Sequence, residues 1–184
     1  LDKMFKAAEY SIDSGISVSC NYIFGFPEDN WESILNNYKA IFKCASMGFT
    51  GVNINAYSPQ PNTSSFKELV EDGHLKDFDD NYFMSLFTFQ SFFVKKTSYN
   101  DLFSANLLTF LITIGFFLFY ISYFLFNPLR IIKTFGSIFK NKKSANKSAT
   151  YLKSMLIESY RIISFRRATM SFFSKSPKNP GGTV

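Results

Sequence analysis

Three asparagines on two short stretches are the residues whose type and spacing could bind a polar ligand. Asn21 lies in ISVSCNYIF, and Asn53 and Asn55 lie in GVNINAY. In each stretch apolar residues alternate with polar ones, which is the pattern of a β-strand with one apolar and one polar face. Two interpretations stay open. In the first, the polar faces line the ligand-filled interior of a barrel that is covered by helices on the outside. In the second, the asparagines are ordinary sheet residues whose amides are satisfied by hydrogen bonds within the protein.

Other chemistries find little support in the sequence. There is no Ser-His-Asp set, no phosphate-binding P-loop and no paired-carboxylate spacing. Cys20 and Cys44 have no metal-site spacing, and we expect both to be buried thiols in a reduced compartment. The single histidine, His74, follows a glycine in a loop among acids, and we interpret it as a solvated loop residue.

A strand–helix–strand unit over residues 16–61 must position the amides. Between the strands, apolar residues recur at three- and four-residue steps and predict one apolar helical stripe: Trp31, Ile34, Leu35, Tyr38, Ile41, Phe42 and Ala45. We expect Asn30 to be the N-cap of this helix and Gly48 to end it. The order strand, helix, strand favours a right-handed parallel crossover. We expect a helix over 1–14 before this unit and a short one over 64–72 after it.

Two motifs in this unit resemble a known family. The sequence IFGFPEDN over 23–30 resembles the fifth-strand motif Ile-x-Gly-Phe-Pro-Gly-Glu-Thr of radical SAM enzymes, and YSPQPNT over 57–63 resembles the Pro-x-Pro-Gly-Thr turn after their sixth strand. The resemblance covers 1–76 and is closest to the subset with a cobalamin-binding domain. Glu28 stands where glycine is usual, so the family's acid is Glu28 or Asp29. Asn62 replaces the turn glycine, and asparagine tolerates positive φ.

The resemblance implies an α/β fold in which 1–76 is the C-terminal portion of a partial (β/α) barrel with parallel strands. The ligand of such a barrel binds at the carboxyl ends of the strands. S-adenosylmethionine is the implied cofactor, with Ile23 and Gly25 against its adenine and Asn21, Asn53 and Asn55 facing the interior. The cofactor-binding set is Asn21, Ile23, Gly25, Glu28, Asn55 and Tyr57.

The rest of the implied machinery lies outside this chain. The Cys-x-x-x-Cys-x-x-Cys loop that holds a four-iron four-sulfur cluster is expected upstream of residue 1, on a missing N-terminal part of the same protein. We assign no catalytic residue and no metal ligand within the chain. Cobalamin is a candidate second cofactor from the subset resemblance. Two strands alone leave open edges, so this fragment is not expected to be catalytic by itself.

The remainder of the chain predicts membrane attachment. Residues 77–101 form an aromatic helical connector. Residues 102–129 carry no charge, and their apolar run matches the roughly 20 residues that cross a bilayer as a helix. Residues 130–173 predict basic amphipathic helices suited to an anionic membrane surface, and 174–184 a disordered tail.

Charge divides the chain into two parts. Residues 1–101 hold 8 Lys or Arg against 13 Asp or Glu, whereas 130–184 hold 12 against 1. The positive-inside rule places the basic part in the cytoplasm, where the oxygen-sensitive barrel is also expected. Either the apolar helix enters the membrane and returns as a monotopic anchor, or the basic part is translocated, or the enzyme resemblance misleads.

Three functions follow as hypotheses. The first is the C-terminal part of a membrane-anchored radical SAM enzyme, its catalytic part facing the cytoplasm, that acts on a lipid-like substrate. The second is a non-catalytic, membrane-tethered binding or scaffold protein with a degenerate barrel. The third is a nucleic-acid binder that uses the basic part, with steeply salt-dependent binding. We expect membrane lipid and the missing N-terminal part as partners, and no nucleic acid.

Overall fold

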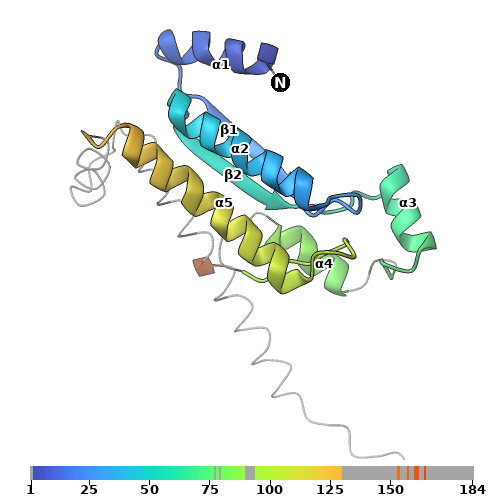
Figure 1. Ribbon diagram of the computed structural model, residues 1–184. Helices are drawn as coiled ribbons and strands as arrows, with labels where there is room; N and C mark the ends of the chain where they lie inside the picture. Colours follow the sequence, from blue (N-terminus) through green and yellow to red (C-terminus); the bar gives the residue numbers. More distant parts are fainter. Residues whose placement is uncertain are drawn as a thin grey trace, which may run out of the picture.

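The computed structural model describes residues 2–76, 78, 80–89 and 94–129, with five further positions at 153, 157, 160, 161 and 164. Its elements, shown in Figure 1, are α1 (Asp2–Asp13), β1 (Ser19–Phe24), α2 (Trp31–Met47), β2 (Gly51–Ala56), α3 (Ser64–Glu71), α4 (Asp80–Thr88) and α5 (Ala105–Phe126). The basic segments predicted for 130–173 lie outside the described residues apart from those five positions, as does the predicted tail over 174–184.

The predicted strand–helix–strand unit is confirmed. β1 and β2 are adjacent and parallel, with Asn21 opposite Asn53 and Ile23 opposite Asn55. Because the two strands run in the same direction, α2 crosses between them and covers one face of the sheet. The first strand begins at Ser19, three residues later than the alternation from Ile16 predicts.

Local signals at both ends of α2 hold the helix in place. The Asn30 side chain accepts hydrogen bonds from the backbone N–H groups of Glu32 and Ser33, and the Ser33 hydroxyl accepts from the Asn30 backbone N–H. This reciprocal capping box satisfies donors that the helix itself leaves unpaired. At the other end Gly48 adopts φ 95°, a left-handed conformation that glycine reaches without steric cost.

The long apolar helix α5 belongs to the same layer as α2. A Cβ on Gly115 would lie 2.8 Å from Ile54 Cδ1, so the backbone of α5 approaches the helix-covered face of β2 closely. The Tyr38 hydroxyl donates to the Leu111 carbonyl oxygen at 2.8 Å, which joins α5 to α2. Figure 1 shows the two helices side by side on the sheet.

The two helices also run in the same direction. Trp31, at the start of α2, packs edge-on against Phe103, just before α5 begins, with ring centroids 5.2 Å apart. Phe42 packs in the same manner against Phe126, at the end of α5, at 5.5 Å. Two successive strands covered by two co-directional helices form the repeat of a β/α architecture. The mixed α/β class is therefore confirmed, whereas the partial barrel stays a prediction.

The segment between β2 and α5 forms a smaller second core. Its buried side chains come from α3, α4 and the loops around them: Phe66, Leu69, Leu75, Tyr82 and Tyr99. Thr63 caps α3 by accepting from the Phe66 N–H. Asn62 adopts φ 66°, as expected for an asparagine in the place of a turn glycine. This core packs against the carboxyl ends of the strands through Tyr57.

Candidate functional site

The predicted amides lie on the face of the sheet opposite α2 and α5. Tyr22 and Ile54 point toward the helices, and because side chains alternate along a strand, Asn21, Asn53 and Asn55 point to the other face. There the Asn53 Nδ2 donates to the Asn21 Oδ1 at 2.7 Å. Asn21 is exposed and Asn53 is partly exposed. One such bond uses only part of the hydrogen-bonding capacity of two side-chain amides.

Ile23 and Asn55 form the next cross-strand pair on the same face. Ile23 is exposed, and Asn55 is partly buried. An apolar side chain beside amides offers van der Waals contact to a ring together with hydrogen bonds to its polar edge. The structure thus brings together four of the residues named from the sequence: Asn21, Ile23, Asn53 and Asn55.

The turn after β1 is held by an acid, and that acid is Asp29. Its Oδ2 accepts from the backbone N–H groups of Gly25 and Phe26 at 2.8 and 3.1 Å, and its Oδ1 accepts from the Ser33 hydroxyl at 2.9 Å. Glu28 has an exposed side chain. The sequence left Glu28 and Asp29 as alternatives for the acid of the turn, and the hydrogen bonds favour Asp29 as its organiser. A ligand-binding role for Glu28 stays a prediction.

Gly25 has two structural reasons to be a glycine. It adopts φ +84°, and a Cβ on it would lie 2.8 Å from the Leu108 Cδ2 of α5. The close approach is therefore on the side of α5. The adenine contact implied for Gly25 by the family resemblance stays a prediction.

Tyr57 links the carboxyl ends of the two strands. Its N–H donates to the Phe24 carbonyl oxygen at 2.8 Å. Its ring packs on Phe26 with centroids 4.7 Å apart and edge-on against Tyr99 at 6.3 Å. Gly25 and Tyr57 therefore lie at the same end of the sheet, the end at which parallel α/β folds bind ligands.

Asn100 organises this end of the sheet, and the sequence analysis did not identify it. Its side chain is buried, and its Nδ2 donates to the carbonyl oxygens of Phe26, Pro27 and Asp29 at 2.7, 3.0 and 2.9 Å. Its Oδ1 accepts from the backbone N–H groups of residues 102 and 103. One amide thus fixes the turn after β1 to the segment that leads into α5.

The two cysteines meet on the helix-covered face, away from the amides. Both are free thiols, and the Tyr22 hydroxyl lies 3.3 Å from the Cys44 Sγ. The hydrogen bond to Cys44 and burial raise the pKa of Cys20, and that same bond lowers the pKa of Cys44 to about 7. Across the part of the chain that the structure describes, no group of three or more His, Cys, Asp or Glu side chains could hold a metal ion.

His74 lies at the surface. Its Nε2 is 3.8 Å from the exposed Asp101 carboxylate, and the imidazole is half-exposed. This arrangement agrees with the interpretation as a solvated loop residue.

Comparison with known proteins gives one partial similarity. A segment of 57 residues, 31% of this chain, is 33% identical to the tRNA-2-methylthio-N(6)-dimethylallyladenosine synthases of two strains of Dehalococcoides mccartyi. The match spans 13% of the length of these relatives, which are radical SAM enzymes. The chain matches no protein-family model and no solved structure. The similarity supports a relation to the radical SAM superfamily and does not extend to its cobalamin-binding subset.

Proposed function

We propose that this chain is part of a radical SAM enzyme and that the amide face of β1 and β2 lies toward S-adenosylmethionine. The observation that carries the proposal is the orientation of Asn21, Asn53 and Asn55 on two adjacent parallel strands. Their side chains lie opposite the layer formed by α2 and α5. In a closed barrel with helices outside, that face is the interior. The partial similarity to radical SAM methylthiotransferases supports the same assignment.

The side chains present fit this cofactor. Amide groups suit the hydroxyl, amine and carboxylate groups of S-adenosylmethionine, and the exposed Ile23 suits its adenine ring. In the proposal Asn21 and Asn55 orient the cofactor, Ile23 and Gly25 contact the adenine, and Tyr57 and Glu28 border the site at the strand ends. The cysteines that would hold the iron–sulfur cluster are not in this chain, which contains Cys20 and Cys44 alone.

The bound cofactors supply the radical chemistry, and this chain orients and shields them. The side chains of the amide face hold the nucleoside in one position. The packing of Tyr57 on Phe26 and Tyr99 keeps water away from the strand ends. The buried amide of Asn100 keeps the turn after β1 in one conformation, so that Gly25 and Asp29 stay in place.

Membrane attachment and a lipid-like substrate complete the proposal. Among the described residues, α5 is long and apolar enough to span a membrane. A barrel held at a membrane with its catalytic part facing the cytoplasm suits a substrate dissolved in the bilayer. Cobalamin is part of the proposal only because the two motifs resemble those of radical SAM proteins that have a cobalamin-binding domain.

The proposal is tested on the full-length protein that contains this chain. After anaerobic reconstitution with iron and sulfide and addition of reductant, we expect 5′-deoxyadenosine to form from S-adenosylmethionine. A protein that folds, takes up no iron and forms no 5′-deoxyadenosine contradicts the proposal and favours the non-catalytic scaffold.

One observation favours an alternative substrate. The relatives are named for the modification of an adenosine in tRNA, and residues 130–184 carry 12 basic residues against 1 acidic. Binding of tRNA by the full-length protein that weakens steeply with salt would favour a nucleic-acid substrate over a lipid-like one.

A further inference from the structure

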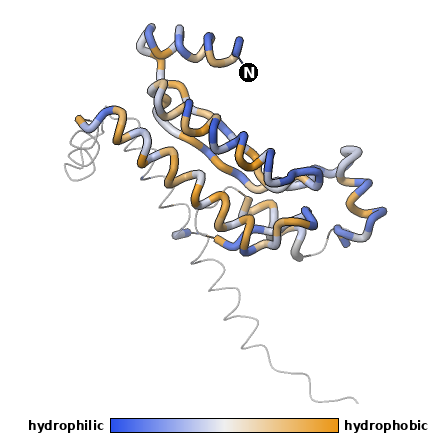
Figure 2. The backbone as a smooth tube through the Cα atoms, in the orientation of Figure 1, coloured by the Kyte–Doolittle hydropathy of each residue, from blue (hydrophilic) through white to orange (hydrophobic). Residues whose placement is uncertain are grey.

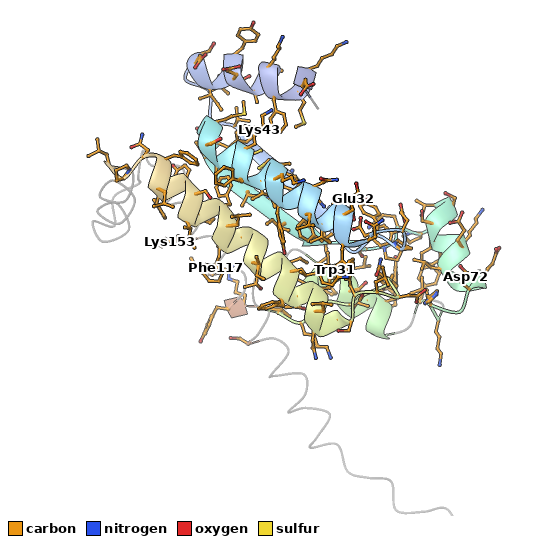
Figure 3. All side chains as sticks on the ribbon, viewed as in Figure 1. Trp31, Glu32, Lys43, Asp72, Phe117 and Lys153 are labelled. Atoms are coloured by element: carbon orange, nitrogen blue, oxygen red, sulfur yellow. The ribbon has the colours of Figure 1, made fainter. Side chains whose placement is uncertain are left out.

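One side of α5 exposes large apolar side chains along its whole length. The exposed positions recur every three or four residues and lie between 37% and 75% exposed: Phe110, Ile114, Phe117, Ile121 and Leu125. We call these five residues the α5 stripe. Figure 2 shows α5 largely in the hydrophobic colour, and Figure 3 labels Phe117 midway along it. Helices that cover a sheet normally present polar residues on their outer side.

The opposite side of α5 is built into the core. Leu108, Ile112 and Phe119 are at most 3% exposed, and Gly115 lies against Ile54 of β2. Contacts with α2 run from Phe103 before the helix to Phe126 at its end. If α5 crossed a bilayer, it would carry α2 and the sheet with it into the hydrocarbon, where exposed charges such as those of Glu32 and Lys39 are costly.

The apolar surface continues from the α5 stripe onto α2. Trp31, Leu35 and Phe42 are exposed there, spaced by four and seven residues, and thus on one flank of the helix. Trp31 and Phe42 contact the two ends of the α5 region, so this flank borders α5. Tryptophan favours the boundary between hydrocarbon and headgroups.

Charge complementarity identifies the surface that this patch fits. Residues 102–129 carry no charge, the exposed Phe126 and Leu129 lie at the end of this run, and Arg130 follows directly. The 12 basic residues against 1 acidic over 130–184 favour a negatively charged partner. An apolar stripe followed by concentrated basic charge is the combination that binds anionic bilayers, at about 1 kcal/mol for each basic residue near the surface.

We infer that α5 lies in the plane of an anionic membrane, with the α5 stripe and the flank of α2 in the headgroup boundary, and that it does not cross. This inference rests on the membrane attachment proposed above and gives its geometry. The α/β layer then stays outside the hydrocarbon, on the same side of the membrane as the basic residues. The conflict between the positive-inside rule and a cytoplasmic barrel disappears.

Binding is tested by flotation of the full-length protein with vesicles of phosphatidylcholine, with and without phosphatidylglycerol. We expect binding to require phosphatidylglycerol and to weaken about tenfold or more in the Phe117→Asp/Ile121→Asp variant, because two apolar side chains leave the interface. Tyr10→Asp, which changes an exposed aromatic residue of α1, should bind like wild type. Circular dichroism melts check that each variant is folded.

The single tryptophan of this chain, Trp31, reports the geometry once any tryptophan elsewhere in the full-length protein is replaced by phenylalanine. Trp31 fluorescence should shift to shorter wavelength on the vesicles, and lipids brominated near the headgroup should quench it more than lipids brominated near the chain ends. Impermeant maleimide should also label cysteines placed at Ser104 and Asn127 from the same side of sealed vesicles, in a Cys20→Ala/Cys44→Ala background, with the label located by mass spectrometry of the peptides that contain positions 104 and 127.

The outcomes separate the two proposals. Labelling of the two ends from opposite sides, or deeper quenching of Trp31 by chain-end bromines, overturns the in-plane inference alone. Absence of binding to either vesicle overturns both the inference and the membrane part of the proposed function. A dimer in solution that Phe117→Asp/Ile121→Asp converts to a monomer, without vesicle binding, assigns the patch to a second copy instead. None of these outcomes bears on 5′-deoxyadenosine formation.

Discussion

The Asn100 side-chain nitrogen lies 2.7 Å from the Phe26 carbonyl oxygen, across 74 positions of sequence. This contact joins the turn at one end of the candidate site to the segment that leads into α5. The position of the turn and the position of α5 are thereby coupled through one buried amide. The site and the surface that we propose to meet lipid are parts of one packed unit.

Replacing Asn100 by alanine should destabilise the protein. The variant leaves partly buried carbonyl oxygens in the turn and two backbone N–H groups without their partner, and the loss of a buried partner costs about 1–3 kcal/mol. We expect the midpoint of urea unfolding to fall with the slope unchanged. Asn36→Ala, at an exposed position of α2, is the matched control and should be neutral. Equal midpoints for the two variants would show that the amide of Asn100 is not structural.

Gly25→Ala should cost more stability than Gly15→Ala. Both glycines have positive φ, at +84° and +78°, but a Cβ meets Leu108 at 2.8 Å only at Gly25 and finds nothing within 4 Å at Gly15. Both variants carry the same backbone strain of about 1–2 kcal/mol, so the difference between their losses of stability measures the clash with Leu108. Thermal unfolding of both variants gives that difference. In a double-mutant cycle with Leu108→Ala, the cost of Gly25→Ala should become smaller in the Leu108→Ala background while the cost of Gly15→Ala stays the same, and unchanged costs of both would refute the contact.

Lys96 should make stability depend on pH. It is 3% exposed, its Nζ donates to the Thr88 carbonyl oxygen at 2.6 Å, and burial lowers its pKa to about 7. An unfolded lysine titrates near 10.4, so between these values the unfolded chain holds more protons than the folded one. The free energy of unfolding contributed by this group therefore rises with pH from about 7 toward 10, by up to about 1.4 kcal/mol per pH unit.

The measurement is urea unfolding at several pH values for wild type and Lys96→Met. The difference between the two proteins removes the contribution of other titrating groups. We expect the variant to gain relative stability toward neutral pH and to lose that advantage as the pH rises. A difference that stays constant from pH 7 to 10 would contradict a buried lysine with a lowered pKa.

Much of the local structure could be predicted because its signals are local. Asn30 caps the start of α2 and Gly48 ends the helix, as expected. Asn62 adopts the positive φ that its turn requires. The alternation in both strands places the asparagines on one face of the sheet. These features depend on residues within a few positions of one another, where propensity and periodicity act.

What the sequence could not supply depends on contacts between distant segments. Nothing near Asn100 in the chain indicates that its amide binds a turn more than 70 residues earlier. Hydropathy identified α5 as an apolar helix but did not separate its core side, which contains Gly115, from the exposed α5 stripe. The choice between Glu28 and Asp29 was open because only the fold shows which carboxylate reaches the N–H groups of the turn. The predicted division of the chain into segments beyond 76 stays a prediction.

The most direct test concerns Asn21 and Asn55 in the reconstituted full-length protein. If the amide face holds S-adenosylmethionine, Asn21→Ala and Asn55→Ala should each raise the Kd for S-adenosylmethionine about tenfold, the worth of one or two hydrogen bonds, and lower 5′-deoxyadenosine formation. Asn36→Ala should change neither, and iron content should be the same in all three variants. Wild-type affinity and 5′-deoxyadenosine formation in both amide variants would contradict the assignment of this face to the cofactor.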